Sequence, residues 1–113
     1  MSVHGMTLRE LIHRSGKIAK EKGWWDDRSV GDFIALCHSE LSEALEYARM
    51  GKKVSDVWIE DLKPEGVIVE LADVYIRIAD YIAQHGLAGE FERAISAKLV
   101  YNSTRPRRHG KEF

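Results

Sequence analysis

The sequence predicts an all-α protein that forms a four-helix bundle. Apolar residues recur at helical spacing in four separate stretches, and no stretch alternates polar and apolar residues as a half-buried strand would. The connectors between these stretches are modest in length, as in helical bundles. A chain of 113 residues has the usual size of one domain, so we expect residues 1–113 to form a single domain with a basic tail from about residue 103.

Composition argues against several classes of protein. A net charge of -1 with 31% charged residues gives no sign of a nucleic-acid-binding or membrane-surface protein. The single cysteine, Cys37, rules out a disulfide within the chain. No apolar run reaches the ~18 residues needed to span a bilayer, and the N-terminus lacks the apolar segment of a signal peptide. We therefore expect a soluble cytoplasmic protein that binds neither nucleic acid nor membrane.

Capping signals mark the first two helices. Thr7 followed by Glu10 forms a capping box, and the helical period that follows continues to about Lys22. Ser29 opens a second helix, which Gly51 ends. These signals predict two amphipathic helices separated by a short connector.

That connector contains two adjacent tryptophans, Trp24 and Trp25. Two neighbouring indoles cannot both face inward easily. In one interpretation a tryptophan closes the end of the bundle; in the other it lines a pocket for a flat ligand. Both residues are therefore candidate substrate contacts.

The second half of the chain predicts two further helices. Residues 51–63 fit a loop with a short helical turn. Pro64 suits a first-turn position, so we expect a third helix from Pro64 to Gln84, followed by a fourth from Leu87 to Asn102. The fourth helix carries an apolar stripe that we expect to face the bundle: Phe91, Ala94, Ile95 and Leu99.

The third helix is the most informative element. It is apolar around most of its circumference, which is typical of a helix enclosed by other protein. One polar stripe within roughly 80° interrupts this pattern, made of Glu70, Asp73, Arg77, Asp80 and Gln84. An unpaired buried carboxylate costs several kcal/mol, so the stripe requires a cation, a metal ion or a wet cleft beside it.

Two acidic pairs share the same spacing on the second and third helices. Glu40 and Glu43, and Glu70 and Asp73, are each three residues apart on faces that can meet. Four converging carboxylates repel one another unless cations neutralise them, and such oxygen ligands suit Mg²⁺, with Mn²⁺ as a substitute. Neither pair includes the histidine that a di-iron bundle requires. The alternative is that each pair is a solvated helix edge.

The basic end of the chain suggests an anion site. Mg²⁺ bound by carboxylates usually keeps positions open for substrate phosphates. Lys98 and Asn102 lie four residues apart on the fourth helix, and a cluster of cationic side chains follows: Arg105, Arg107, Arg108, His109 and Lys111. The alternative is a disordered basic end without a ligand.

Three stretches together resemble a known enzyme family. Ser39–Glu46 reads SELSEALE, Val69–Asp80 reads VELADVYIRIAD, and Lys98–Lys111 reads KLVYNSTRPRRHGK. This order of E-x-x-E, E-x-x-D and a lysine with an asparagine four residues later resembles the MazG-like all-α nucleoside triphosphate pyrophosphohydrolases. The similarity extends from about Trp24 to the C-terminus.

The resemblance implies a Mg²⁺-dependent hydrolase that cleaves a nucleoside triphosphate between the α and β phosphates, with a role in nucleotide-pool sanitation. It implies four metal ligands: Glu40, Glu43, Glu70 and Asp73. It also implies substrate contacts at Lys98, Asn102, Arg105 and Lys111. Some relatives have a glutamate where this chain has Ser39. Glu40 or Glu43 is the candidate for orienting the attacking water, and spacing does not choose between them.

Two other functions fit the same residues. One is hydrolysis of a phosphoribosyl-nucleotide on the same fold, and the other is a non-catalytic helical module whose acidic stripe pairs with a partner. Four short helices, one of them apolar around most of its circumference, leave surface to cover, so we expect a homodimer or homotetramer.

Overall fold

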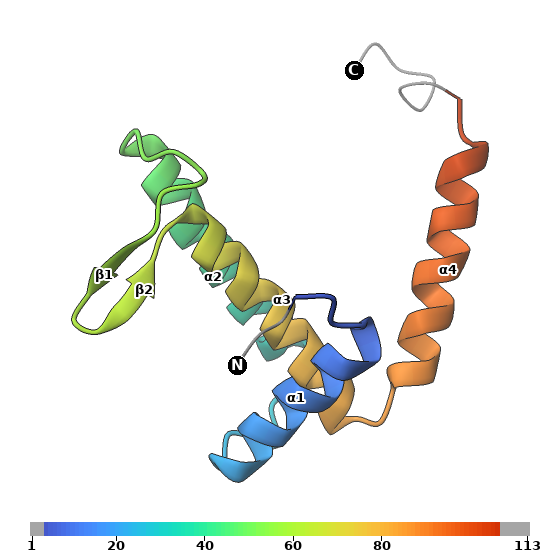
Figure 1. The fold of residues 1–113 in the computed structure, drawn as a ribbon. Coiled ribbons are helices and arrows are strands. Elements are labelled where there is room, and N and C mark those ends of the chain that lie inside the picture. Colours follow the sequence, from blue (N-terminus) through green and yellow to red (C-terminus); the bar gives the residue numbers. More distant parts are fainter. Residues whose placement is uncertain (1–3, 107–113) are drawn as a thin grey trace.

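The structure, a computed structural model, describes residues 4–106 of the chain, and within that range the protein is mostly helical, as predicted (Figure 1). Its elements in chain order are α1 (Leu8–Glu21), α2 (Val30–Arg49), β1 (Trp58–Glu60), β2 (Lys63–Glu65), α3 (Val67–Gln84) and α4 (Ala88–Thr104). No helix of the described residues is both long and apolar enough to cross a membrane.

The caps predicted for α1 and α2 are confirmed. The Thr7 hydroxyl accepts a hydrogen bond from the Glu10 backbone N–H over 3.1 Å, and the Glu10 carboxylate accepts from the Thr7 backbone N–H. The Ser29 hydroxyl accepts from the Asp32 backbone N–H over 3.1 Å. These bonds satisfy N–H groups that lack a partner within the helix, which explains why both helices begin where they do.

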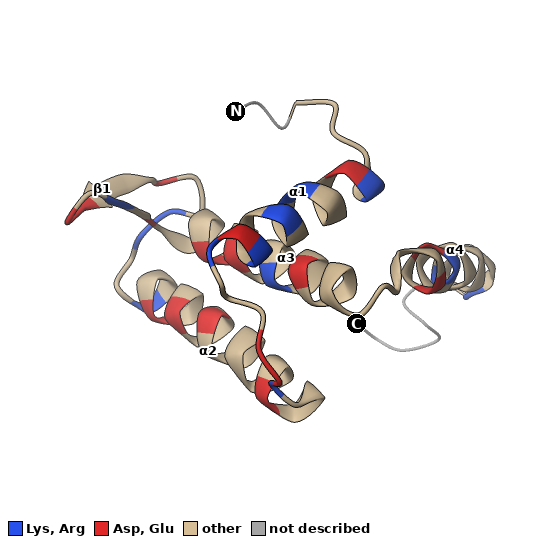
Figure 2. Cartoon of the chain, turned by 90° about the horizontal axis from the view of Figure 1, so that it is seen from below, with Lys and Arg blue, Asp and Glu red and all other residues tan. Residues whose placement is uncertain are grey.

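The central helix of the body is α3, which packs against α1 on one side and α2 on the other (Figure 2). Gly16 of α1 permits this approach, because a Cβ atom there would lie only 2.5 Å from the Ala83 Cβ of α3. The prediction that protein encloses α3 on all sides is wrong for the single chain. One edge stays open, where Leu71 and Tyr75 are 41% and 69% exposed.

A small β-hairpin replaces the loop predicted between α2 and α3. Strands β1 and β2 pair antiparallel, with Ile59 opposite Pro64. Asp61 and Leu62 at the turn have φ angles of 51° and 67°, the left-handed conformation that a two-residue hairpin turn requires. The expectation of a structure without strands is therefore wrong for this segment, which was too short to show an alternating pattern.

The predicted start of α3 at Pro64 is also wrong. Pro64 lies in β2, where its missing N–H is tolerated because this two-stranded sheet has only edge strands. The helix begins after Gly66, whose φ is 141°. A Cβ atom at Gly66 would lie 2.4 Å from the carbonyl oxygen of Asp56, so the chain needs glycine to turn from the hairpin into α3.

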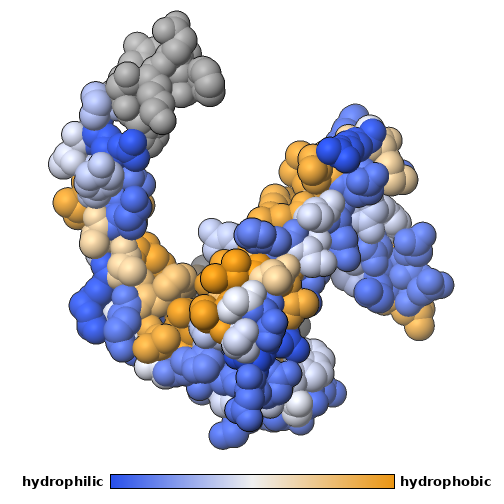
Figure 3. All heavy atoms as spheres, turned by 180° about the vertical axis from the view of Figure 1, so that it is seen from behind, coloured by the Kyte–Doolittle hydropathy of each residue, from blue (hydrophilic) through white to orange (hydrophobic). Residues whose placement is uncertain are grey.

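Helix α4 does not complete a four-helix bundle within the described chain. It leaves the body beyond the end of α3, and none of its residues is buried (Figure 1). In its predicted inward stripe, Phe91 and Ile95 are half-buried, whereas Ala94 and Leu99 are exposed. Figure 3 shows apolar side chains along α4 and across the adjoining body, on either side of a hollow. The contacts of α4 with the body lie in its first half, where Glu92 accepts a hydrogen bond from Arg9 of α1 over 3.0 Å, and its second half is exposed.

Candidate metal centre

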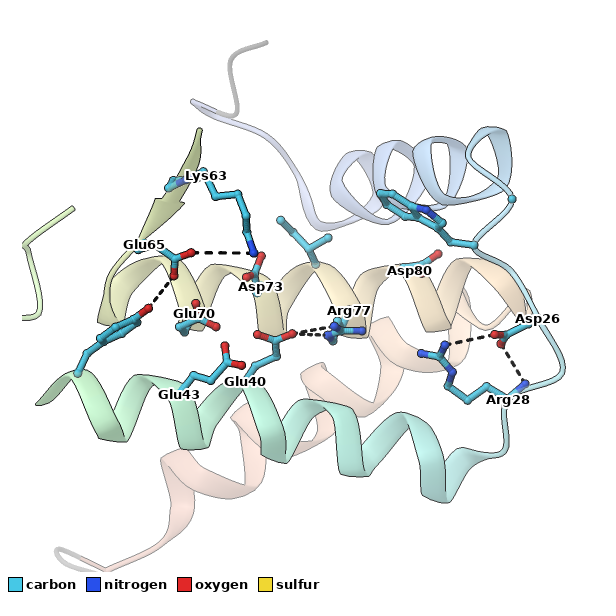
Figure 4. Close-up of a pocket in the computed structure, with 15 residues that line it drawn as sticks. Asp26, Arg28, Glu40, Glu43, Lys63, Glu65, Glu70, Asp73, Arg77 and Asp80 are labelled. Atoms are coloured by element: carbon cyan, nitrogen blue, oxygen red, sulfur yellow. Dashed lines mark hydrogen bonds and ion pairs between the residues drawn. The ribbon is translucent and has the colours of Figure 1, made fainter. Parts of the chain in front are cut away.

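An open cavity of about 900 Å³ lies between α2, α3, the hairpin and the connector that follows α1. Its ionisable lining is mostly acidic: Asp26, Glu40, Glu43, Glu65, Glu70, Asp73 and Asp80. Three cationic side chains complete it: Arg28, Lys63 and Arg77. Figure 4 shows the members of α2 and α3 between the two helices, with Lys63 and Glu65 of the hairpin at one end and Asp26 and Arg28 of the connector at the other. Both predicted acidic motifs therefore open into one cavity.

Three of the predicted ligands form a tight group. Glu40 and Glu43 project from adjacent turns of α2 toward Glu70 on α3 (Figure 4). One carboxylate oxygen from each residue lies within 4.8 Å of the others. The i,i+3 spacing on α2 places both carboxylates on the face that packs against α3. The structure thus brings the two motifs together as predicted.

Glu70 is the unusual member of this group. It is only 3% exposed, and its Oε2 atom is buried without a hydrogen-bond partner among the described residues. Burial, followed by hydrogen bonding to and repulsion from Glu40 and Glu43, raises the pKa of Glu70 to about 8. A buried oxygen without a donor, on a carboxylate that lies close to two others, fits a bound cation better than it fits a packed core.

Glu40 differs from Glu70 in that its pKa is lowered, and Arg77 contributes to this. Both Nε and Nη2 of Arg77 donate to Oε1 of Glu40, over 2.9 and 2.7 Å. Burial alone would raise the pKa of Glu40, but hydrogen bonds from Glu70 and Arg77 outweigh burial and lower that pKa below its ordinary value. Arg77, a member of the polar stripe of the third helix, thus contacts a candidate ligand directly.

Asp73 lies in the same cavity but outside the group of three. Burial and the negative charge of Glu40 raise its pKa. The Lys63 side chain of the hairpin points toward it (Figure 4). Of the four predicted carboxylates, three therefore form the tight group, and Asp73 lies in the same cavity outside that group.

Three further groups line the cavity that the sequence analysis missed, namely Tyr47 of α2 and Lys63 and Glu65 of the hairpin. Tyr47 donates its hydroxyl to Glu65 over 2.7 Å, and the Lys63 ammonium lies 4.0 Å from the same carboxylate. The hydrogen bond to Glu65, together with partial burial, raises the pKa of Tyr47 to about 12. Lys63 and Glu65 match no motif in the sequence. The turn at Asp61 and Leu62 brings them to the cavity, and the sequence did not predict that turn.

The two tryptophans divide between the two interpretations. Trp25 is half-buried, and its indole N–H donates to Asp80 over 2.6 Å. Its ring also lies against Gly16, so it closes the α1–α3 contact. Trp24 is 62% exposed and lines the acidic cavity. Trp24 therefore remains a candidate for ligand contact, whereas Trp25 supports the structure.

A second, smaller cavity of about 150 Å³ adjoins the first. Trp24, Ile76 and Asp80 line both cavities. The rest of the second lining comes mainly from α1 and is largely apolar: Met6, Leu11, Arg14, Ser15, Ile18 and Ala19. The acidic cavity thus has an apolar side chamber with an indole at the junction.

The predicted anion site on α4 is not part of this cavity in the single chain. Lys98 and Asn102 do not line either cavity described above. Lys98 and Arg105 instead lie over the Tyr101 ring, 5.0 and 5.3 Å from its centroid. Lys111 falls outside the described residues. Among the residues that the structure describes, Lys98, Asn102 and Arg105 therefore lie apart from the predicted metal ligands.

The donor set suits Mg²⁺. Its members are carboxylate oxygens, which hard divalent cations prefer, and the described residues place no histidine or cysteine in the group. The unpartnered oxygen of Glu70 supplies a second, independent reason to expect a cation here. No protein-family model, curated protein or solved structure matches the chain.

Proposed function

We propose that this protein is a Mg²⁺-dependent nucleoside triphosphate pyrophosphohydrolase of the MazG-like type, which converts a (d)NTP to the (d)NMP and pyrophosphate. The observation that carries the proposal is the convergence of Glu40 and Glu43 on a buried Glu70 whose Oε2 has no hydrogen-bond partner within residues 4–106. Removal of unwanted nucleotides from the cellular pool is the role that such a reaction would serve.

The chain supplies most of what the reaction requires. Mg²⁺ held by the acidic group would offset the charge of the triphosphate and of the departing pyrophosphate. A carboxylate accepts a proton from water as the water oxygen forms its bond to the α-phosphorus. The bond from that phosphorus to the bridging oxygen then breaks, and pyrophosphate leaves with the electron pair.

Glu43 is the better candidate for accepting this proton. Arg77 occupies one oxygen of Glu40 and holds its pKa low, which makes Glu40 a weaker base. Glu43 is exposed in the same cavity, where it can reach a water beside the substrate. In this proposal Glu40 and Glu70 hold the metal, and Glu43 both contacts the metal and orients the water.

The side chamber supports a nucleotide as the substrate. Its apolar walls and the Trp24 indole at its mouth suit a flat heterocycle, while the acidic cavity next to it suits a metal-bound phosphate chain. A base in the chamber would leave the phosphates in the acidic cavity.

The proposed assembly is a homodimer or homotetramer. Leu99, Val100 and Tyr101 of α4 are each more than half exposed, and a second copy would cover such a surface. A partner subunit is also the route by which Lys98 and Asn102 would reach a phosphate chain. The nucleotide would then contact two subunits.

The proposal is tested by incubating the pure protein with a panel of standard and modified (d)NTPs and Mg²⁺ in ¹⁸O-labelled water. We expect pyrophosphate rather than phosphate, with the label in the monophosphate, because attack occurs at the α-phosphorus. Turnover restricted to a phosphoribosyl-nucleotide would support the first alternative. No turnover and no stabilisation by millimolar Mg²⁺ would support a non-catalytic helical module.

A further inference from the structure

The contact between Arg77 and Glu40 has a geometry that bears on metal choice. Two N–H groups of Arg77 donate to one and the same oxygen, Oε1 of Glu40, over 2.9 and 2.7 Å. A carboxylate offers about two acceptor positions on each oxygen, so these two donors occupy Oε1 fully. Only Oε2 of Glu40 is left to bind a cation.

We propose that Arg77 is a positioning residue that sets the metal preference of the acidic group by making Glu40 bind through a single oxygen. The inference rests on the metal centre of the proposed function. Mg²⁺ requires near-ideal octahedral geometry, whereas Ca²⁺ accepts a larger and more flexible set of oxygens, including both oxygens of one carboxylate. A Glu40 restricted to Oε2 therefore favours Mg²⁺ and Mn²⁺ over Ca²⁺.

The pair is built into the site and is not a loose surface contact. The Glu40 side chain is 14% exposed and that of Arg77 is 37% exposed, and both line the acidic cavity. Arg77 follows Glu70 by seven residues, two helical turns, so the two project from the same side of α3. The guanidinium thus reaches Glu40 from the helix that supplies the buried ligand.

Arg28 provides a matched comparison within the same cavity. Its Nη2 contacts Asp26 over 3.2 Å, and the two side chains are 40% and 55% exposed. Neither residue belongs to the group of three carboxylates. Removal of Arg28 takes away one positive charge and one ion pair from the cavity without altering Glu40.

The test measures Mg²⁺ and Ca²⁺ affinities of the full chain by calorimetry, for the wild type and for Arg77→Met and Arg77→Lys. Both ions carry the same charge, so loss of the guanidinium charge alone changes both affinities by a similar factor. The ratio of the two affinities therefore reports coordination. We expect Arg77→Met to raise the Ca²⁺ to Mg²⁺ affinity ratio about tenfold, the scale of outer-shell substitutions at metal sites.

Arg77→Lys keeps the charge but lacks the planar fork of donors, so we expect the ratio to move in the same direction. Arg28→Met should leave the ratio unchanged. An unchanged ratio in the folded Arg77 variants overturns the inference, and Arg77→Lys carries the test alone if Arg77→Met does not fold.

The outcomes also separate this inference from the proposed function. A wild-type protein that binds neither ion would overturn the metal centre and the inference with it. A wild-type protein that binds Mg²⁺ but hydrolyses no nucleotide would overturn the reaction alone, because the affinity ratio is measured without turnover. Turnover with an unmoved ratio would overturn only the role of Arg77.

Discussion

The α2–α3 pair and helix α4 differ in how much of their surface packs against the rest of the same chain. On α2 and α3, Glu40 and Glu70 come together because the two helices pack against each other within the chain. On α4, Lys98 and Asn102 lie on a helix with no buried residue, and neither lines the two cavities. The predicted motifs therefore come together where their helices pack within the chain, and Lys98 and Asn102 stay apart from them because α4 does not pack along α2 or α3.

Glu70→Gln should have the largest effect, because it removes a carboxylate from the acidic group that α2 and α3 form within one chain. The amide keeps the shape of the side chain but removes its charge, so we expect Mg²⁺ to lose its stabilising effect and pyrophosphate release to fall by roughly 100-fold or more. Metal-dependent thermal melts and a pyrophosphate assay measure the two changes.

Glu46→Gln is the matched control for that variant. Glu46 is an exposed glutamate on α2 that pairs with Arg49 over 3.8 Å, outside the group of three. Its removal should leave turnover and the Mg²⁺ response at wild-type values. Full turnover in Glu70→Gln would show that the acidic group is not the catalytic centre.

Leu99→Glu should have the next largest effect, and it changes the exposed apolar surface of α4. Leu99 is 64% exposed, and a charge there would oppose its burial by a second copy. We expect the wild type to elute as a dimer or tetramer and the variant as a smaller species in size-exclusion chromatography with light scattering. Mg²⁺ should still stabilise the variant, because its proposed ligands lie within one chain.

A wild-type protein that stays monomeric at tens of micromolar would remove the proposed assembly. Loss of the Mg²⁺ response in a folded Leu99→Glu protein would show that the metal centre also depends on the second copy. The first result would mean that no second copy covers α4, and the second that the acidic group on α2 and α3 is not complete within one chain.

The pH dependence of stability should show a smaller effect, confined to the α2–α3 pair. The pKa of Glu70 rises from 4.5 to about 8 in the folded state, so the folded protein binds this proton more tightly than the unfolded chain does. The stabilisation is complete below the unfolded pKa and is lost as the pH rises toward 8. We expect the metal-free melting temperature to fall over that range.

Glu70→Gln isolates this contribution, because its side chain does not titrate. The difference between the wild-type and variant melting temperatures should change with pH between about 4.5 and 8. A constant difference would show that Glu70 ionises normally in the folded protein.

The sequence predicted the helical parts of the structure closely, because helices are encoded locally. The caps at Thr7 and Ser29 bind the backbone groups that the sequence predicts. The acidic pairs also needed only helical spacing and one packing contact to converge on Glu70. For these features, the information lies within a few residues of each side chain.

The rest depended on contacts that are distant in the sequence or lie outside the chain. The hairpin that carries Lys63 rests on two residues with positive φ, neither of which is glycine. The open position of α4 could not be read from its apolar stripe, since the same stripe would suit the core of one chain or the interface between two. The helical period places the Arg77 charge on the face of α3 that carries Glu70. Only the folded α2–α3 pair shows that two N–H groups of Arg77 donate to one oxygen of Glu40.

Lys98→Ala should produce the smallest change, and it asks directly whether α4 belongs to the site. Lys98 lies over the exposed Tyr101 ring, so its removal should cost little stability. If a partner subunit brings Lys98 to the phosphates, loss of one such contact should raise the KM for the nucleotide several-fold, about 1 kcal/mol, with little change in kcat. Arg93→Ala is the control, because Arg93 lies on the same helix and pairs with Glu90. Equal KM values for the wild type and both variants would place the phosphate contacts on α2, α3 and the hairpin alone, and α4 would then serve assembly without touching the substrate.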